Sequence, residues 1–152
     1  MNLTQNDRLN QVTADTLVVG VDIGSETHFA RCFDWRGYEF NKRAFRFSNT
    51  QVGFLTFIRW VEEMMKKTEK TKVIVGCEPT GCYWLTFQKF LTDRDILLVT
   101  VNPYSVKKCK ELDDNSPEKS DLKDPKTIAG LVREGRYSTS YLPEGVYAEI
   151  RE

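Results

Sequence analysis

Four acidic residues have the side chains and positions to hold divalent metal ions. Asp22 ends the apolar run LVVGVDIG, Glu78 ends a second apolar run, VIVGCE, and Asp121 and Asp124 precede a late helical pattern. Carboxylate oxygens are hard ligands that suit magnesium or manganese. Crowded carboxylates repel one another, and bound cations offset that repulsion. Two such ions about 4 Å apart can stabilise the attacking and leaving oxygens of a phosphodiester displacement. If the four acids meet, the set predicts metal-dependent phosphodiester chemistry.

Each acid also has an ordinary structural explanation. Asp22 precedes a glycine and could be a turn residue, Glu78 precedes a proline and could close a strand, and Asp124 could cap a helix. Any one of them alone favours the structural explanation. Their joint placement favours a metal site.

The elements that carry Asp22 and Glu78 are predicted strands. Residues 17–23 and 72–77 are short apolar runs, typical of buried strands. In a strand, alternate side chains share a face, so Gly20 lies beside Asp22 and Gly76 beside Glu78, and each glycine clears space next to its acid. If these two strands are neighbours in the sheet, the carboxylates converge.

The late acids belong to a predicted helix. Proline suits the first turn of a helix, which makes Asp124 a natural N-cap before Pro125, and Gly135 is a fitting stop. Asp124 heads the apolar stripe of Ile128, Leu131 and Val132, so we expect it to point inward. Asp121 lies on the same side if the turn before the helix is helix-like.

The remaining pattern predicts an α/β fold. Strands at 17–23, 27–33 and 38–47 follow closely enough to be antiparallel neighbours. A helix of about five turns, from apolar spacing after residue 51, leads to the strand at 72–77. The helix after residue 82 then crosses to a strand at 96–101, and such crossovers join parallel strands. A short helix to about 110 and a loop at 111–120 precede the late helix. The result is a mixed sheet of three antiparallel and two parallel strands with helices on both faces, the ribonuclease H-like layout.

Length and composition define the class of protein. The chain has 152 residues, enough for one domain, which we place at 16–136 between a loose polar tail at 1–15 and a segment at 137–152 that leads onward. With 22 basic and 22 acidic residues the net charge is zero, which argues against a simple basic nucleic-acid coat. No apolar run approaches the roughly 18 residues of a membrane helix, and no signal peptide is present, so we expect a cytoplasmic protein without a membrane partner.

The cysteines and the histidine do not suggest a zinc site. Cys32, Cys77, Cys82 and Cys109 contain no C-x-x-C pair, and we expect ordinary buried thiols. His28 is the only histidine, and we interpret it as structural.

Four sequence blocks resemble one known family. They are GVDIGSETHFA around Asp22, CEPTGCYW around Glu78, VNP at 101–103, and KSDLKDPKTIAGLV around Asp121 and Asp124. In this order they resemble the N-terminal domain of the insertion-sequence 110 transposases, recombinases of Asp-Glu-Asp-Asp type related to pilin-gene invertases. The resemblance implies a RuvC-like, ribonuclease H-like fold in which these four acids bind magnesium or manganese and act on DNA. Pro125 stands where such proteins often have alanine.

The resemblance also carries expectations about the whole protein. Family members have a C-terminal domain with a serine nucleophile, some are guided by a structured RNA, and a homo-oligomer is expected for the full-length protein. We expect that second domain to follow outside these 152 residues, with the segment from Pro143 beginning the connection to it. The fragment should therefore bind metal without completing recombination alone.

Basic residues could contact a nucleic-acid backbone. Lys42, Arg43 and Arg46 interleave with Phe45 and Phe47 on the expected third strand. Charge on an edge strand also prevents aggregation, and the two explanations stay open. Lysines near the acids, including Lys119 and Lys123, suit a phosphate backbone approaching bound metal, with solvated surface charge as the alternative.

Two other functions compete with a recombinase domain. Asp22, Gly24 and Ser25 also resemble the first phosphate loop of actin-like kinases, but no second D-x-G-[ST] is present. An interaction module that has lost its chemistry is the third possibility, and retention of all four acids counts against it.

Overall fold

The protein is described by a computed structural model that covers residues 3–113 and 123–139, with side chains for 3–109 and 125–139. Within these residues one mixed sheet has the strand order β3-β2-β1-β4-β5-β6. The strands are β1 (Thr16–Asp22), β2 (Thr27–Phe33), β3 (Phe45–Ser48), β4 (Lys72–Cys77), β5 (Leu97–Thr100) and β6 (Ser138–Thr139). The helices are α1 (Gln5–Asn10), α2 (Gln51–Thr68), α3 (Tyr83–Thr92), α4 (Pro103–Asp113) and α5 (Lys123–Arg133).

The strand directions agree with the predicted layout. β3, β2 and β1 are antiparallel neighbours, whereas β1, β4 and β5 run parallel. The crossover through α3 explains the parallel β4 and β5, because it returns the chain to the same end of the sheet. β6 adds an antiparallel strand beside β5, at the start of the segment at 137–152.

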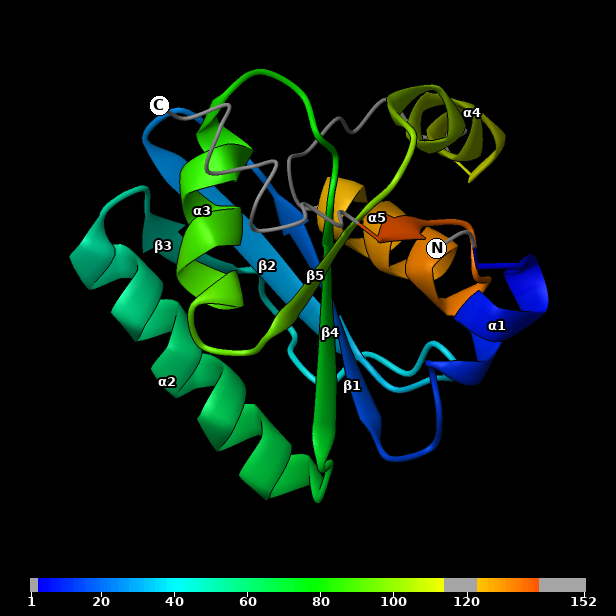
Figure 1. The fold of residues 1–152 in the computed structure, drawn as a ribbon, viewed down its shortest axis with the longest axis horizontal. Helices are drawn as coiled ribbons and strands as arrows, with labels where there is room; N and C mark the ends of the chain where they lie inside the picture. The colour runs from blue at the N-terminus through cyan, green and yellow to red at the C-terminus, as the bar shows by residue number, and fades with distance from the viewer. Residues whose placement is uncertain (1–2, 114–122, 140–152) are drawn as a thin grey trace.

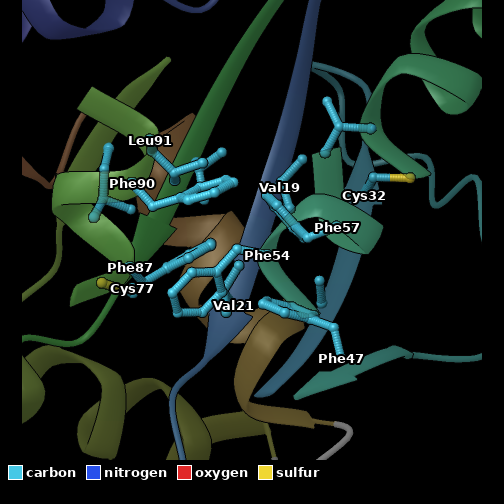
Figure 2. Packing of buried hydrophobic residues seen from close by; sticks show 14 of the residues in the cluster. Val19, Val21, Cys32, Phe47, Phe54, Phe57, Cys77, Phe87, Phe90 and Leu91 are labelled. Carbon is cyan, nitrogen blue, oxygen red and sulfur yellow. The ribbon is translucent and has the colours of Figure 1, made fainter. Parts of the chain in front are cut away.

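One face of the sheet is covered by α2 and α3 (Figure 1). Phenylalanines fill this layer: Phe54 and Phe57 of α2 and Phe87 of α3 are fully buried, and Phe47 of β3 packs among them (Figure 2). Ring centroids of Phe47 and Phe57 lie 4.7 Å apart. Aromatic pairs at such separations add stabilisation beyond their buried area, so this cluster anchors both helices to the sheet.

The opposite face carries α5, with α4 beside it (Figure 1). The apolar stripe of α5 is buried against alternate residues of the central strands, Val18 of β1 and Ile74 of β4 among them. The stripe consists of Ile128, Ala129, Leu131 and Val132. The predicted helical stripe is therefore confirmed, and the sheet has helices on both faces.

The N-terminal residues differ from the expected loose tail. Residues 5–10 form α1, with Thr4 as N-cap and Asp7 completing a capping box. Arg8 Nε donates to the carbonyl oxygen of Gly135 at 2.8 Å, and the Tyr137 hydroxyl donates to the carbonyl oxygen of Arg8 at 2.8 Å. Composition alone predicted no structure here because the partners of α1 lie more than 120 residues away in sequence.

Three boundaries differ from the sequence-based expectation by more than one residue. The third strand covers only Phe45–Ser48, so Lys42 and Arg43 lie in the connection before it. α4 continues to Asp113, into the expected loop. α5 begins at Lys123, so Asp124 lies within its first turn rather than at the N-cap. Pro125 is compatible with this position, because the first N–H groups of a helix have no intrahelical partner and the N–H that proline lacks is not needed.

No helix in the described ranges 3–113 and 123–139 is long and apolar enough to span a membrane.

Candidate metal and nucleic-acid site

Asp22 and Glu78 lie side by side at one end of the sheet. β1 and β4 are parallel, and their register pairs Gly20 with Gly76 and Val21 with Cys77, which makes Asp22 and Glu78 the next pair. Adjacent strands are about 4.8 Å apart, and residues paired across a ladder share a face. Both acids are half-buried. The predicted neighbourhood of the two strands is confirmed, and the convergence of the two carboxylates stays a prediction.

The face they share is the one covered by α5. A Cβ on Gly20 would stand 2.0 Å from the carbonyl oxygen of Pro125, and a Cβ on Gly76 would stand 2.5 Å from Val132 Cγ2. The two glycines thus admit α5 against the strands immediately before each acid. The sequence predicted that each glycine clears space beside its acid. The structure shows that α5 occupies this space.

α5 brings the backbone of Asp124 close to the same end of the sheet. Its neighbour Pro125 lies against Gly20, two residues before Asp22. The side chains of Asp124 and Lys123 are outside the described part of the structure, as are Asp121 and Lys119 altogether. The prediction that the late aspartates complete the site therefore stays a prediction.

Among the residues whose side chains are described, no group of three or more His, Cys, Asp or Glu residues could hold a metal ion. The described donors are thus two carboxylates, Asp22 and Glu78. Their hard oxygen atoms fit magnesium or manganese, and a half-buried pair of neighbouring negative charges is an environment that a cation stabilises. The late acids would have to supply the remaining protein ligands.

The thiols and the histidine are separate groups from this carboxylate pair, although Cys77 directly precedes Glu78 in the sequence. All four cysteines are free; burial raises the pKa of both Cys32 and Cys77 to about 12, in keeping with inert buried thiols, whereas Cys82 is exposed, contrary to expectation. His28 is fully buried on the α2 face, 5.1 Å from Phe47 between ring centroids. Burial lowers the pKa of His28, and the hydrogen bond with Asn49 opposes this only in part. The structural interpretation of His28 is therefore confirmed.

Arg46 lies on the same face of the sheet as Asp22. The antiparallel registers pair Asp22 with Phe29 and Phe29 with Arg46, which forms one row across β1, β2 and β3. Its neighbours Phe45 and Phe47 point to the α2 layer, as alternation requires. Arg46 is exposed and lies two strand spacings, about 10 Å, from the backbone of Asp22. The sequence predicted the alternation, but only the β2–β3 register reveals which face Arg46 occupies.

A second charged group lies beyond this row. Arg31 Nε lies 3.2 Å from Glu39 Oε2, and both side chains are largely buried. Burial raises the pKa of Glu39, while the positive charges of Arg31 and Lys126 act to lower it. Lys126, near the start of α5, therefore contributes positive charge near Glu39.

Comparison with known proteins gives two findings. Residues 19–152 match the family model of insertion-sequence 110 transposases of Asp-Glu-Asp-Asp type, whose description is "Transposase". The fold is similar to that of T. thermophilus RuvC solved in complex with a Holliday junction substrate, with a TM-score of 0.52 and 15% identity over 82% of this chain and 99% of that one. Comparison with curated protein sequences gives no match.

Proposed function

This chain belongs to the insertion-sequence 110 family of transposases, and on that basis we propose that it is the metal-binding catalytic domain of a DNA recombinase. In this proposal Asp22, Glu78, Asp121 and Asp124 hold magnesium or manganese. The reaction is cleavage of a DNA phosphodiester and transfer of the strand, completed together with a serine of a further, C-terminal domain. A guide RNA and a homo-oligomeric full-length protein, located in the cytoplasm, belong to the same proposal.

One observation carries the proposal. Asp22 and Glu78 follow the paired residues Val21 and Cys77 of parallel neighbouring strands, on the face where α5 begins. Three separate segments of the chain therefore approach one end of the sheet, and each brings at least one of the four acids. An acid that served only as a turn residue or a helix cap would not require this arrangement.

The chemistry follows from the donor set. Divalent cations bound by carboxylates stabilise the negative charge that develops on the phosphodiester oxygens during displacement. The protein residues have two tasks: the strand-end acids supply the donor oxygens, and the buried core on both faces keeps the strand ends rigid.

DNA is the proposed substrate. The RuvC structure with a similar fold was determined with a Holliday junction, which supports a branched duplex as the class of ligand. Arg46 offers a positive charge on the row that begins at Asp22, which suits contact with a phosphate of bound DNA. Lys42 and Arg43 are close to β3 in the chain, and we assign them the same role, together with Lys119 and Lys123. The kinase alternative has no comparable support, since the family match is to transposases.

Calorimetric titration of the chain with Mn²⁺ tests the metal site. The native chain is expected to bind Mn²⁺ with displacement by excess Mg²⁺, and Asp22→Asn or Glu78→Gln is expected to weaken binding at least tenfold, about 1.4 kcal/mol. Glu63→Gln, an exposed acid on α2 at the opposite layer, is the matched control and should bind as the native chain does. Equal binding by Asp22→Asn would reject the site.

Anomalous diffraction from crystals soaked in Mn²⁺ gives an independent answer. The expected peak lies between the ends of β1 and β4 and is absent in Asp22→Ala. In the full-length protein the same substitution should abolish recombination while the domain stays folded. A peak remote from all four acids, or undiminished recombination, would contradict the proposal.

A further inference from the structure

A hydrogen-bond network centred on the buried His28 fixes the turn that directly follows Asp22. β1 ends at Asp22 and β2 begins at Thr27, so residues 23–26 must reverse the chain between them. The N–H of Gly24 donates to Nδ1 of His28 at 3.0 Å. Because Nδ1 accepts, the ring of neutral His28 carries its proton on Nε2, which donates to Asn49 Oδ1 at 3.0 Å.

Asn49 ties the same turn to the start of α2. Its Nδ2 donates to the carbonyl oxygen of Ser25 at 3.1 Å, and its backbone N–H donates to the carbonyl oxygen of Glu26 at 2.9 Å. Asn49 lies immediately before Thr50, the N-cap of α2. The turn is therefore held at three points, Gly24, Ser25 and Glu26, by the side chains and backbone of His28 and Asn49.

The imidazole of His28 has little freedom to move. It is fully buried, and its ring lies 5.1 Å from that of Phe47, 6.1 Å from Phe54 and 5.9 Å from Phe87, measured between centroids. These phenylalanines belong to the core cluster of the α2 face (Figure 2). Because the ring is held in this core, its Nδ1 accepts from the Gly24 N–H at a fixed position.

Gly24 itself permits only a small range of turn geometry. A Cβ at this position would lie 2.3 Å from the carbonyl oxygen of Thr27, so the turn closes tightly on the start of β2. Gly24 is two residues from Asp22 along the chain. A shift of the Gly24 amide is therefore transmitted to the Asp22 backbone with one intervening residue to absorb it.

From this geometry we infer that His28 and Asn49 are positioning residues for Asp22: they hold the turn after β1 and thereby the donor oxygens of Asp22 at the metal site. The inference rests on the proposed function, because it assumes that Asp22 binds metal. Residues that orient a metal ligand without contacting the metal typically raise metal affinity about tenfold or more. Neither residue contacts the metal in this arrangement, and the effect acts through the backbone.

Mn²⁺ titration of the chain with three variants tests the inference. His28→Phe keeps a ring among the phenylalanines but removes both hydrogen bonds, and should weaken Mn²⁺ binding about tenfold. His28→Asn retains an amide oxygen near the place of Nδ1 and should recover part of that loss. Asn49→Ala, at a partly exposed position, removes the ties to His28 and Ser25 without touching the core, and should also weaken binding.

The metal-free chain provides a second readout. Amide hydrogen exchange at Gly24 should be faster in His28→Phe and slow again in His28→Asn, since the N–H is donated to the side chain at position 28. A role limited to core packing would lower stability in His28→Phe but leave the Mn²⁺ affinity unchanged. Folding of each variant is checked by circular dichroism before titration.

The outcomes separate the two proposals. This inference alone is overturned if Asp22→Asn loses Mn²⁺ binding while folded His28→Phe keeps its Mn²⁺ affinity within about twofold of the native chain. That result would fall well short of the tenfold loss expected for an orienting group. If His28→Phe does not fold, Asn49→Ala decides in the same way. A native chain that does not bind Mn²⁺, or whose binding survives Asp22→Asn, overturns the proposed function and this inference with it.

Discussion

Gly20 of β1 pairs with Gly76 of β4 in the parallel ladder, and both glycines face α5. The carbonyl oxygen of Pro125 would lie only 2.0 Å from a Cβ of Gly20, so the helix backbone approaches the strand as closely as two backbones can. This approach sets the distance between the strand-end acid Asp22 and the start of α5. The absence of a side chain at two paired positions is thus what places the late helix over the candidate site.

Gly20→Ala is predicted to destabilise the fold by about 3 kcal/mol or more, because the added methyl meets helix backbone that cannot rotate away. The free energy of unfolding in urea measures the effect. Gly130→Ala in α5 is the control: among the described residues, apart from the helix's own backbone, only Arg133 Nη2 lies within 4 Å of the added Cβ, at 3.9 Å. Alanine in a helix interior should add about 0.5–1 kcal/mol of stability. Equal stability of the two variants would contradict the close approach.

Asp34→Ala is predicted to cost about 1–3 kcal/mol, because it removes the acceptor of two backbone N–H groups. Asp34 Oδ1 accepts from the N–H of Arg36 at 2.8 Å and of Tyr38 at 2.9 Å, and Gly37 closes the turn with φ +96°. Asp34→Asn keeps that oxygen and should cost less than about 1 kcal/mol, since the ion pair it loses is with a largely exposed Arg36. Urea unfolding compares the two variants.

The stability of the fold is also expected to depend on acid pH through Asp34. Burial alone would raise the pKa of Asp34, but hydrogen bonds from the Tyr38 and Arg36 backbones and the Arg36 side chain outweigh it, and the pKa lies below its ordinary value of 3.8. A lowered carboxyl pKa contributes stability above the unfolded value, which is lost as the pH falls through the folded value. The native chain should therefore lose stability relative to Asp34→Asn below pH 3.8; parallel curves would refute this.

His28 predicts a second pH dependence, in the mildly acidic range. Its folded pKa is lowered by burial below the ordinary value of 6.5, so as the pH falls below 6.5 the unfolded chain takes up a proton that the folded chain does not, and stability decreases. The residues that surround the ring, Gly24, Asn49, Phe47, Phe54 and Phe87, bring no charged side chain to it. His28 is the only histidine in the chain, so no other imidazole contributes.

Urea unfolding at about pH 7.5 and about pH 5.5, on either side of the ordinary histidine pKa, measures this dependence. The native chain should be less stable at the lower pH, and His28→Phe should remove most of the difference. If His28→Phe shows the same decrease as the native chain, the proton uptake arises elsewhere.

The basic residues before and on β3 predict a salt-dependent contribution to DNA affinity. Replacing Lys42, Arg43 and Arg46 with alanine should reduce the slope of log affinity against log salt by about one for each phosphate that these side chains neutralise. Arg59, Lys66 and Lys67, exposed on α2 at the opposite layer, form a control triple with the same change in charge. Fluorescence anisotropy with a branched duplex provides the measurement. An equal reduction of the slope in both triples would show that net charge, rather than the Arg46 row, is responsible.

The local pattern of the sequence was sufficient for most elements. β2 and β4 were predicted with their observed bounds, because each is a short run closed by turn residues. The parallel pairing of β4 with β5 follows from the handed crossover through α3, and the same crossover suggested that the strands ending at Asp22 and Glu78 are neighbours. Local pattern was misleading at α1, whose helix is held by Gly135 and Tyr137 at the far end of the described chain.

By itself the sequence determined the family, the order of the elements from β1 to α5 and four candidate acids, since periodicity and short blocks are local properties of a chain. Only the tertiary structure decided that α5 backbone fills the space beside Gly20, that Arg46 shares a row with Asp22, and that His28 holds the Gly24 turn. Each of these depends on strand register or on packing between distant segments. Such contacts form when the whole core closes, and no window of neighbouring residues contains them.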